Sequence, residues 1–566
     1  MIPGPLAPSR AYGPVEDSGL GAGGWGAQVL WGVEGLPAQG TATVCFARLP
    51  RPSTLALACL ALAFGTLVTP AGGQARLPKR FDADVARALR AFQVPGTAIA
   101  VVKDGKVLLA KGYGVQEVGG RTPMDAHTLL QIASNTKAFT TACLAMLVDS
   151  GQLTWDDPVT RYLPDFQLFD PWVTREFTIR DLVTHRSGLG LGAGDLLWLH
   201  SNYSRREIIR RLRAARPVSS FRSQYAYDNV LYAVAGEIIP AVTGTTWEAF
   251  VRQRILSPLA MTETRTGVAD LRPGDPLATA HGVLGGTLQI VPLDTVDNIG
   301  PAAALISSVT DLAKWAIVQL DSGRAGKARL WSAGQAREMW SAQTITPITD
   351  PPPPLAALRP NFTAYALGWR VRDYRGRKVV SHTGGLAGMT SRTTLVPDQR
   401  LGIIMLTNGE SDMYEALTYE LLDHFFGVPR TDWVAAFQTA AQQEQASADS
   451  QLATLRRTRD TTSRPSLPLA RYAGRYSDAL YGDATIALEN GVLVLRFSHS
   501  PAFVGDLGYW QYDTFRTSWR TPNLPDAFVT FTLKPNGAVD QFTMEAVSPL
   551  ADFSFDYQDL RFVPVR

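Results

Sequence analysis

The sequence predicts an α+β fold, in which an antiparallel sheet is flanked by helices and joined to a helical subdomain, followed by a small antiparallel β-barrel. Two β-type runs, 97–103 and 106–113, meet at Asp104-Gly105, a dipeptide suited to a tight hairpin turn. A buried amphipathic helix is expected after them over 134–151, an order that favours α+β over a parallel doubly wound sheet. Near the C-terminus, alternating apolar runs joined by Asn-Gly turns predict antiparallel strands.

Length and charge limit the classes of function. A chain of 566 residues, 45% hydrophobic and 19% charged, is long enough for about two to four globular domains. Its 54 basic and 51 acidic residues leave a formal net charge of +3, without a long basic run, which argues against a nucleic-acid partner. We divide the chain into a leader (1–75), a main α+β domain (76–430), a linker (431–467) and a barrel domain (468–566).

The leader has the layout of a secretory signal peptide at about 48–75. Two arginines precede the apolar run 55–68, and a small-residue stretch follows it. The run is too short to span a bilayer, so we expect cleavage, no stable membrane span afterwards, and a periplasmic or extracellular location. A single uncleaved anchor is the alternative. Because signal peptides open a chain, residues 1–43 are expected to precede the true start, with Val44 as a candidate initiator.

The three cysteines predict no disulfide in the mature chain. Cys45 and Cys59 lie in the leader, which leaves only Cys143 after processing. Cys143 falls on the apolar face of the helix expected over 134–151, so we expect it to pack in the core.

That helix carries the first candidate catalytic pair, Ser134 and Lys137. Three residues of separation place the amine beside the hydroxyl on one face of the first turn, and a helix N-terminus favours negative charge there. A serine needs a base to become a nucleophile, and a lysine can be that base only if burial lowers its pKa. The plain structural alternative is a capping serine beside a surface lysine.

The second candidate group precedes a helix expected over 229–244. The phenol of Tyr227 can move a proton between a nucleophile and a leaving group, and the amide of Asn229 can bind a substrate carbonyl or the lysine. Tyr225 competes with Tyr227 for this role, and aromatic packing is the alternative for both.

The third candidate group is His382-Thr383-Gly384-Gly385, which follows a short strand over 378–381. Glycines let a substrate backbone lie against a strand, and the N–H of Gly385 could point at an oxyanion. The alternative is that these residues only shape the end of the strand and have no role in binding. The same sheet is expected to include strands over 391–396 and 401–407.

Other polar patterns are interpreted as structure. Thr178 and Asp181 have the spacing of a capping box. Asp181 and His185 are four residues apart, as metal pairs can be, but no third ligand is nearby, so we expect no metal there. We also expect a helix over 307–315 and a surface loop at the proline-rich run 350–354, which could form the rim of a cleft.

Taken in order, Ser-x-x-Lys, Tyr-x-Asn and His-Thr-Gly resemble the motifs of the penicillin-recognising serine hydrolases. The phrases TIRDLVTHRSGL, YDNVLYAVAGEII and HTGGLAGM are similar to the branch that holds class C β-lactamases, D-alanyl-D-alanine carboxypeptidases, D-aminopeptidases and related esterases. The resemblance spans about residues 80–425 and implies a β-lactamase/transpeptidase-like fold.

The resemblance also implies roles. Ser134 would be the acylated nucleophile, Lys137 its partner in proton transfer, and Tyr227 the general base and acid. Which of the latter two takes the first proton stays open. The remaining implied roles are substrate binding by Asn229, Thr383 and Gly384, carboxylate binding or tuning of Tyr227 by His382, and an oxyanion hole from the backbone N–H groups of Ser134 and Gly385. No metal or organic cofactor is implied.

One departure from class C β-lactamases concerns the third motif, which begins with His382 where those enzymes have lysine. Since histidine is only partly charged near neutral pH, peptide or ester hydrolysis ranks above antibiotic breakdown. We therefore expect an exported serine hydrolase that cleaves peptide, amide or ester bonds through an acyl-enzyme, like a D-alanyl carboxypeptidase or D-aminopeptidase. The alternatives are a β-lactamase, a carboxylesterase, or a non-catalytic binding or scaffold protein. The expected partner is a small-molecule or peptide substrate, and a homo-oligomer is an open possibility.

The C-terminal part resembles the lipocalin-like domain appended to some members of this family. A polar segment that reads as helical and then flexible precedes it. Two hairpins are expected, over 485–497 around Asn490-Gly491 and over 527–544 around Asn536-Gly537. Its aromatic residues are expected to fill the barrel, with a ligand box as the alternative; they are Tyr509, Trp510, Tyr512, Phe515 and Trp519. The domain could also cover the catalytic cleft or mediate assembly.

Overall fold

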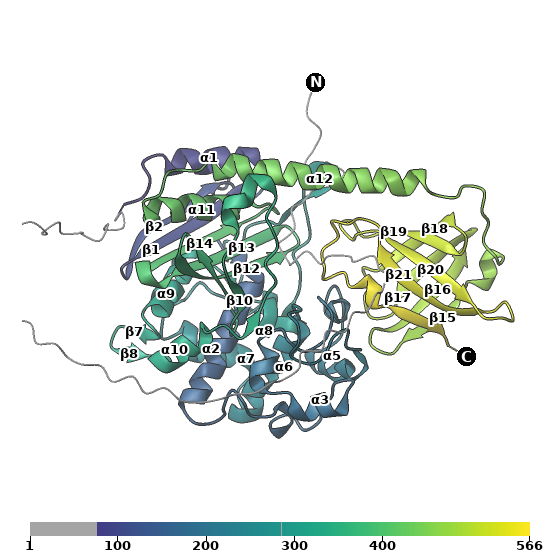
Figure 1. Cartoon of the computed structure of the whole chain (residues 1–566), viewed down its shortest axis with the longest axis horizontal. Coiled ribbons are helices and arrows are strands. Elements are labelled where there is room, and N and C mark those ends of the chain that lie inside the picture. Colours follow the sequence, from purple (N-terminus) through teal and green to yellow (C-terminus); the bar gives the residue numbers. More distant parts are fainter. Residues whose placement is uncertain (1–75, 285, 566) are drawn as a thin grey trace, which may run out of the picture. The chain divides into compact units, whose positions relative to one another are not determined.

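The computed structural model describes residues 76–284 and 286–565. The predictions for the signal peptide, the start codon, Cys45 and Cys59 lie outside these residues. The described part contains an eight-stranded antiparallel sheet, in the order β2-β1-β14-β13-β12-β11-β10-β9, and a closed barrel of strands β15 to β22 (Figure 1). This confirms the predicted α+β class with a C-terminal barrel. We call the part of the chain from α1 to α12, which includes strands β1 to β14, the mixed domain. The part that holds β15 to β22 is the barrel domain.

The predicted hairpin forms one edge of the large sheet. Strands β1 (Gly96–Lys103) and β2 (Lys106–Gly114) pair antiparallel. Asp104 and Gly105 both have positive φ, 52° and 75°, as a two-residue hairpin turn of this type requires. The other strands of the sheet are β14 (Leu401–Thr407), β13 (Met389–Val396), β12 (Arg377–Leu386), β11 (Arg370–Tyr374), β10 (Thr363–Tyr365) and β9 (Thr344–Ile345).

Helices cover both faces of this sheet. In strand β1, Ile99 and Val101 belong to one hydrophobic cluster and Ala98 and Ala100 to another, because successive side chains point to opposite faces. One face packs against α11 (Met413–Phe426), which in turn contacts α1 (Phe81–Ala91) and α12 (Trp433–Arg457) (Figure 1). The other face packs against α9 (Val309–Leu320), whose N-cap is Ser308.

The helix after the hairpin is more deeply buried than its pattern predicts. Helix α2 (Thr136–Asp149) is buried at 12 of its 14 positions, so it is a central helix rather than an amphipathic one. Helices α6 (Val230–Thr243), α7 (Trp247–Val251), α8 (Gly300–Ala303) and α10 (Ala333–Met339) all contact it. Cys143 lies on this helix and is buried, as expected.

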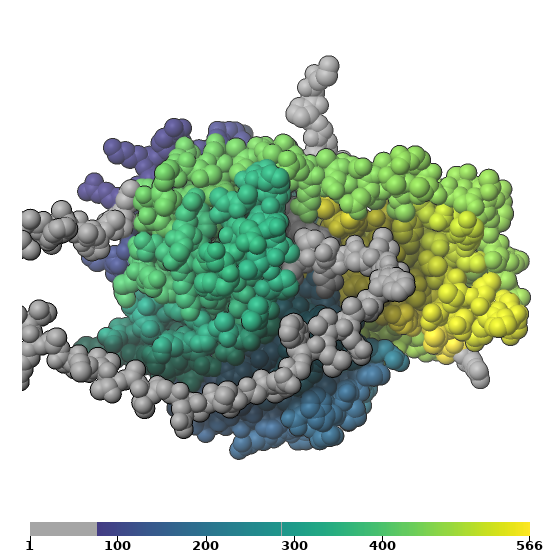
Figure 2. All heavy atoms as spheres, viewed as in Figure 1, coloured from purple at the N-terminus to yellow at the C-terminus, as the bar shows by residue number. Residues whose placement is uncertain are grey.

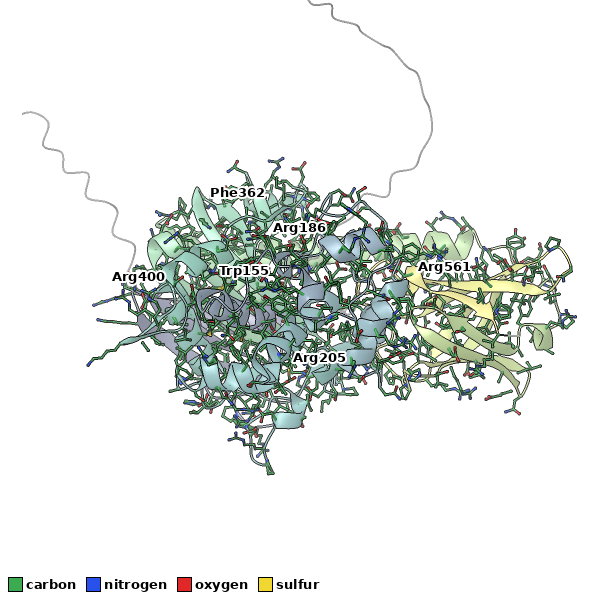
Figure 3. The ribbon with its side chains drawn as sticks, turned by 90° about the horizontal axis from the view of Figure 1, so that it is seen from below. Trp155, Arg186, Arg205, Phe362, Arg400 and Arg561 are labelled. Atoms are coloured by element: carbon green, nitrogen blue, oxygen red, sulfur yellow. The ribbon has the colours of Figure 1, made fainter. Side chains whose placement is uncertain are left out.

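The remaining helices form the region around α6. Thr178 and Asp181 make the predicted capping box at the start of α4 (Ile179–Leu182). Arg205, labelled in Figure 3, opens α5 (Arg205–Arg211) and donates to Glu237 and Glu248. The blue segment that includes α5 and α3 (Pro171–Glu176) forms the lower surface of the mixed domain in the space-filling view (Figure 2). None of the helices among the described residues is long and apolar enough to cross a membrane.

Short strands complete the mixed domain. They pair as β3 (Leu130–Gln131) with β6 (Ile306–Ser307), β4 (His281–Leu284) with β5 (Thr287–Ile290), and β7 (Arg324–Ala325) with β8 (Ala328–Arg329). The proline-rich run leads into a 3₁₀ turn, Pro353–Leu358.

The barrel domain is closed and filled by aromatic rings. Its strands are β15 (Gly474–Asp478), β16 (Gly482–Glu489), β17 (Val492–Phe497), β18 (Val504–Gln511), β19 (Thr514–Trp519), β20 (Ala527–Leu533), β21 (Val539–Ala546) and β22 (Arg561–Pro564). Phe531 lies 4.8 Å from Tyr472 and 5.5 Å from Phe542 between ring centroids. Of the aromatic residues expected inside, Phe515 is buried in this cluster, whereas Tyr512 is 57% exposed and so does not fill the barrel.

Candidate active site

One pocket gathers residues from all three sequence motifs. They come from the start of α2, the start of α6 and strand β12, which are far apart in the sequence and meet where the helices pack on the sheet. The pocket is lined by Ser134, Leu191, Trp198, Tyr227, Asn229, Ala303, Arg370, His382, Thr383, Gly385, Leu386, Asp552, Phe553 and Ser554.

Ser134 lies in a tightly held 3₁₀ turn, Ala133–Asn135, immediately before α2. Ala133 has a φ of +46°, a left-handed conformation that costs energy for a residue with a Cβ and therefore needs support from its surroundings. Ser391 on β13 supplies it by accepting from the Asn135 amide at 2.8 Å and donating to the Ile132 carbonyl at 2.7 Å. The turn that presents the hydroxyl is therefore fixed to the sheet.

Gly384 makes this close approach of turn and sheet feasible. A Cβ atom on Gly384 would lie 2.2 Å from the Ile132 carbonyl oxygen and 2.6 Å from Ser391 Oγ. Gly384 packs against the segment that carries Ser134, while its neighbours Thr383 and Gly385 line the pocket; substrate binding by Gly384 stays a prediction.

Lys137 is fully buried, and its amine has three oxygen neighbours. Its Nζ atom lies 3.0 Å from Ser134 Oγ, 2.7 Å from Asn229 Oδ1 and 3.2 Å from the Ala302 carbonyl. Burial lowers the pKa of this amine to about 7, against an opposing effect of the Asp195 carboxylate. A substantial fraction of the lysine is then neutral near neutral pH, which is the state a base requires.

Tyr227 faces the serine hydroxyl from the other side. Its phenol is a hydrogen-bond partner of Ser134, and the Lys137 Nζ atom lies 4.7 Å from the centre of its ring. Burial raises the pKa of this phenol well above its usual value, so the phenol is protonated. The competing residue, Tyr225, has a buried hydroxyl with no hydrogen-bond partner among the described residues.

Asn229 lines the pocket and also contacts Lys137. Its amide oxygen accepts from Lys137, and its amide nitrogen donates to Asp195 Oδ2 at 2.8 Å. Both ends of the amide are thus used inside the protein, which favours a positioning role over the substrate contact that was also expected.

His382 is neutral in this environment. Its Nδ1 atom lies 2.6 Å from the Thr383 carbonyl, which can only accept, so Nδ1 carries the proton and Nε2 accepts from the Tyr365 hydroxyl at 2.9 Å. Burial, helped by the Lys137 charge, holds the pKa of the ring well below its usual value. A neutral ring does not provide the cation that was considered for binding a substrate carboxylate.

Arg370, which none of the three motifs includes, supplies a cation to the pocket. It lies on β11 opposite Ser381, next to His382, and its guanidinium stands 5.7 Å from the centre of the Tyr225 ring. Among the described residues, no carboxylate forms an ion pair with it. The turn at Arg375-Gly376 between two β-type runs is the sequence signal that could have revealed this neighbouring strand.

The Asp181 and His185 pair is structural, as expected. Asp181 accepts hydrogen bonds from Arg186 at 2.7 Å and from Arg222 at 2.6 Å, and Arg186 is labelled in Figure 3. His185 Nδ1 accepts from the backbone N–H of Asp228. Within residues 76–284 and 286–565, no three side chains of His, Cys, Asp or Glu are grouped so as to hold a metal ion.

The barrel domain also contributes to the pocket. Asp552, Phe553 and Ser554 lie between β21 and β22, and the Phe553 ring meets the Tyr227 ring edge-on at a centroid distance of 5.8 Å. No motif pointed to this loop. Two roles were considered for this domain, which are to cover the catalytic cleft and to mediate assembly. The contact between Phe553 and Tyr227 supports the first.

The comparisons to known proteins agree with the fold. A family model described as Beta-lactamase matches residues 81–425, and one described as Domain of unknown function (DUF3471) matches residues 458–564. The chain is 30% identical over 439 residues to unguisins hydrolase ungD of Aspergillus violaceofuscus, an alignment that covers 72% of this chain and 76% of the relative.

Two solved structures share the fold. The octameric penicillin-binding protein homologue from Pyrococcus abyssi aligns with a TM-score of 0.56 at 20% identity, covering 82% of this chain and 98% of that one. The D-amino acid amidase from Ochrobactrum anthropi SV3, complexed with L-phenylalanine amide, aligns with a TM-score of 0.50 at 22% identity, covering 61% and 96%.

Proposed function

The chain belongs to the beta-lactamase family, and we propose that it is an exported serine hydrolase that cleaves peptide or amide bonds through an acyl-enzyme. The observation that carries this proposal is the fully buried Lys137 amine, 3.0 Å from the Ser134 hydroxyl. A lysine is seldom buried without a task, because burial disfavours its charge. A non-catalytic scaffold would not need it.

The contacts of Lys137 favour it over Tyr227 as the first base. A neutral amine has two N–H bonds and one lone pair. Asn229 Oδ1 and the Ala302 carbonyl can only accept, so they take the two N–H bonds and the lone pair faces Ser134. Tyr227 begins protonated and is suited to the opposite task of giving a proton to the leaving group.

The proposed reaction has two halves. Ser134 Oγ attacks the substrate carbonyl carbon while its proton passes to Lys137, and the backbone N–H groups of Ser134 and Gly385 stabilise the oxyanion. The bond to the leaving group breaks as Tyr227 protonates that group, and the proton held by Lys137 restores the phenol. Water then attacks the acyl-enzyme, and its proton returns to Ser134 as the acid product leaves.

The lining of the pocket holds a cation, Arg370, which is suited to a free carboxylate on the substrate, and a carboxylate, Asp552. Arg370 is a pocket cation without an ion-pair partner among the described residues, and His382 beside it is neutral. Two similar proteins add support: one is a hydrolase, of unguisins, and the other is a D-amino acid amidase, which favours the amide class over esters and β-lactams. Short peptides that end in a D-residue with a free carboxylate are therefore the substrates to test first.

Covalent labelling tests the proposal without knowledge of the substrate. A fluorophosphonate probe should label the wild-type protein at Ser134, as located by mass spectrometry, and should not label Ser134→Ala. Equal labelling of both proteins would remove the basis of the enzyme proposal. Turnover should then be compared on D-alanyl dipeptides, D-aminoacyl amides, p-nitrophenyl esters and a chromogenic cephalosporin. Ser134→Ala should lower the best rate by about 10⁴–10⁶.

Export and assembly are further parts of the proposal. Export rests on the apolar run 55–68, and N-terminal sequencing of the expressed protein should place the mature terminus near residue 75. Self-association is proposed by analogy with the octameric homologue from Pyrococcus abyssi, and light scattering of the purified protein measures it directly.

A further inference from the structure

Asp195 is a buried carboxyl group directly behind the catalytic pair. It has no exposed surface and does not line the pocket. Its Oδ2 atom accepts from the Asn229 amide at 2.8 Å and its Oδ1 atom from the Trp198 indole at 2.7 Å. Ser554 of the barrel loop is a further hydrogen-bond partner. Burial raises the pKa of this carboxyl to about 7, and the hydrogen bonds from Trp198, Asn229 and Ser554 together with the charge of Lys137 oppose that rise, so the group is largely ionised at pH 8.

This carboxylate determines which end of the Asn229 amide faces Lys137. The two ends of an asparagine amide are nearly equal in shape, so packing alone does not distinguish them. An ionised carboxylate only accepts, and therefore it requires the NH₂ end of Asn229. The amide oxygen is then turned toward Lys137, which it contacts at 2.7 Å. The reversed amide would present a donor to the amine and occupy the lone pair that Ser134 needs.

The same group supplies a countercharge when Lys137 takes up a proton. The titratable groups that face Lys137 are Tyr227, Tyr232, His185, His382 and Asp195. Burial, and next the charge of Lys137, hold the pKa of both histidines well below the usual value, so both rings are neutral. Asp195 is the carboxyl group among them that favours the ammonium. Burial, and next the charge of Asp195, raise the pKa of the neighbouring Asp556 carboxyl well above its usual value, so Asp556 does not compete with Asp195 as the countercharge.

Asp195 is itself held in place from the barrel domain. The Asp556 side chain accepts from the backbone N–H groups of Gly194 at 2.7 Å and Leu196 at 3.0 Å, on either side of Asp195, and from the Tyr481 hydroxyl. These contacts fix the turn Asp195–Leu197 through residues far later in the sequence. Gly194 and Asp556, for example, are 362 residues apart.

We propose that Asp195 is a positioning residue for the acylation step, which orients the Asn229 amide, holds the countercharge of Lys137, and is anchored by the barrel domain. This rests on the proposed function, since it assumes that Lys137 is the base for Ser134. The barrel domain is then a part of the catalytic machinery rather than an appended module.

The test uses the full chain and a fluorophosphonate as probe. The rate of Ser134 labelling is measured from pH 5 to 9 for the wild type and for Asp195→Asn, which keeps the size of the side chain but removes its charge. Loss of the countercharge lowers the pKa of Lys137, so the midpoint of the labelling profile should move to lower pH. Loss of the fixed amide orientation should slow labelling about tenfold at pH 8, the effect of one hydrogen bond.

The matched control is Asp311→Asn. Asp311 is equally buried and accepts from the backbone of Glu263 and Thr264, away from the pocket. This control should lower stability without moving the midpoint. If Asp195→Asn does not fold, Ser554→Ala provides the second variant, with a smaller shift in the same direction because one hydrogen bond to the carboxylate is lost.

The outcomes separate the two proposals. If Asp195→Asn has the same midpoint and labelling rate as the wild type, the role of Asp195 is overturned while the hydrolase proposal stays intact. If Asp195→Asn does not fold, unchanged labelling of Ser554→Ala would overturn the role of Asp195 in the same way. Absence of labelling at Ser134 in the wild type itself would overturn the function on which the inference rests.

Discussion

The Phe553 ring of the barrel loop packs edge-on against the Tyr227 ring, with their centroids 5.8 Å apart. The barrel loop also occupies space beside Gly192, whose Cβ, if added, would lie 2.6 Å from the Phe553 carbonyl oxygen. One wall of the pocket therefore belongs to a domain that the three motifs do not include. The choice of substrate should depend on that wall.

Phe553→Ala should change substrate preference more than stability. Removal of the ring enlarges the pocket beside Tyr227, so KM should rise about tenfold for small substrates, which lose an apolar contact worth roughly 1–2 kcal/mol. Bulkier acyl groups should lose less or gain. Steady-state kinetics over the substrate panel measures this. Phe528→Ala is the control, because Phe528 packs on Trp510 in the barrel domain. A uniform effect on all substrates would contradict a role in specificity.

Activity should depend on a base with a pKa near 7. Lys137 must be neutral to accept the serine proton, and burial lowers its pKa to about 7. The value of kcat/KM should therefore fall about tenfold per pH unit below that pKa, where the amine is protonated. Lys137→Arg keeps a cation that does not deprotonate and should abolish this limb together with most of the activity. An acid limb near pH 4 would point instead to a carboxylate as the base.

Arg370 should select substrates with a carboxylate. In Arg370→Gln, KM for a D-alanyl dipeptide should rise at least about tenfold, because a charge-assisted hydrogen bond is lost. The same dipeptide with its C-terminus amidated should bind both proteins about equally, so this pair of substrates serves as the control. An equal loss for the acid and the amide would show that Arg370 supports the fold of the pocket rather than the charge of the substrate.

Gly384→Ala should displace the nucleophile. The new Cβ would lie 2.2 Å from the Ile132 carbonyl oxygen, which is a backbone atom and cannot rotate away as a flexible side chain can, so the turn that carries Ser134 must shift. We expect a loss of about 1–3 kcal/mol in the free energy of unfolding, and fluorophosphonate labelling slower by about 10² because the attack geometry is disturbed. Denaturant melts and labelling rates measure these separately.

The control for Gly384→Ala is Gly508→Ala on strand β18, where the nearest atom to the new Cβ is 3.8 Å away. That substitution should leave labelling unchanged. Normal labelling of Gly384→Ala would mean that the turn and the strand can move apart without consequence for the hydroxyl.

Local chemistry accounts for the elements that were predictable. Asp104-Gly105 predicted the hairpin of β1 and β2 because both residues tolerate positive φ, and Thr178 with Asp181 predicted a helix start because their side chains satisfy free backbone groups. The pattern of α2 was less informative. Several other helices pack around α2, so it is also buried at positions that an amphipathic pattern assigns to solvent.

Sequence alone determined the identity and order of the groups that we propose to react: a serine three residues before a lysine, then a tyrosine, then a strand that carries a histidine. These follow from residue types at short spacing, which the chain carries without folding. Tertiary structure decided what surrounds them. Asp195, Arg370 and Phe553 reach the site only because helix, sheet and barrel loop pack together, and burial among those elements sets the charge of Lys137 and His382. Burial and contacts between distant segments are properties of the packed molecule, and no short stretch of the chain encodes them.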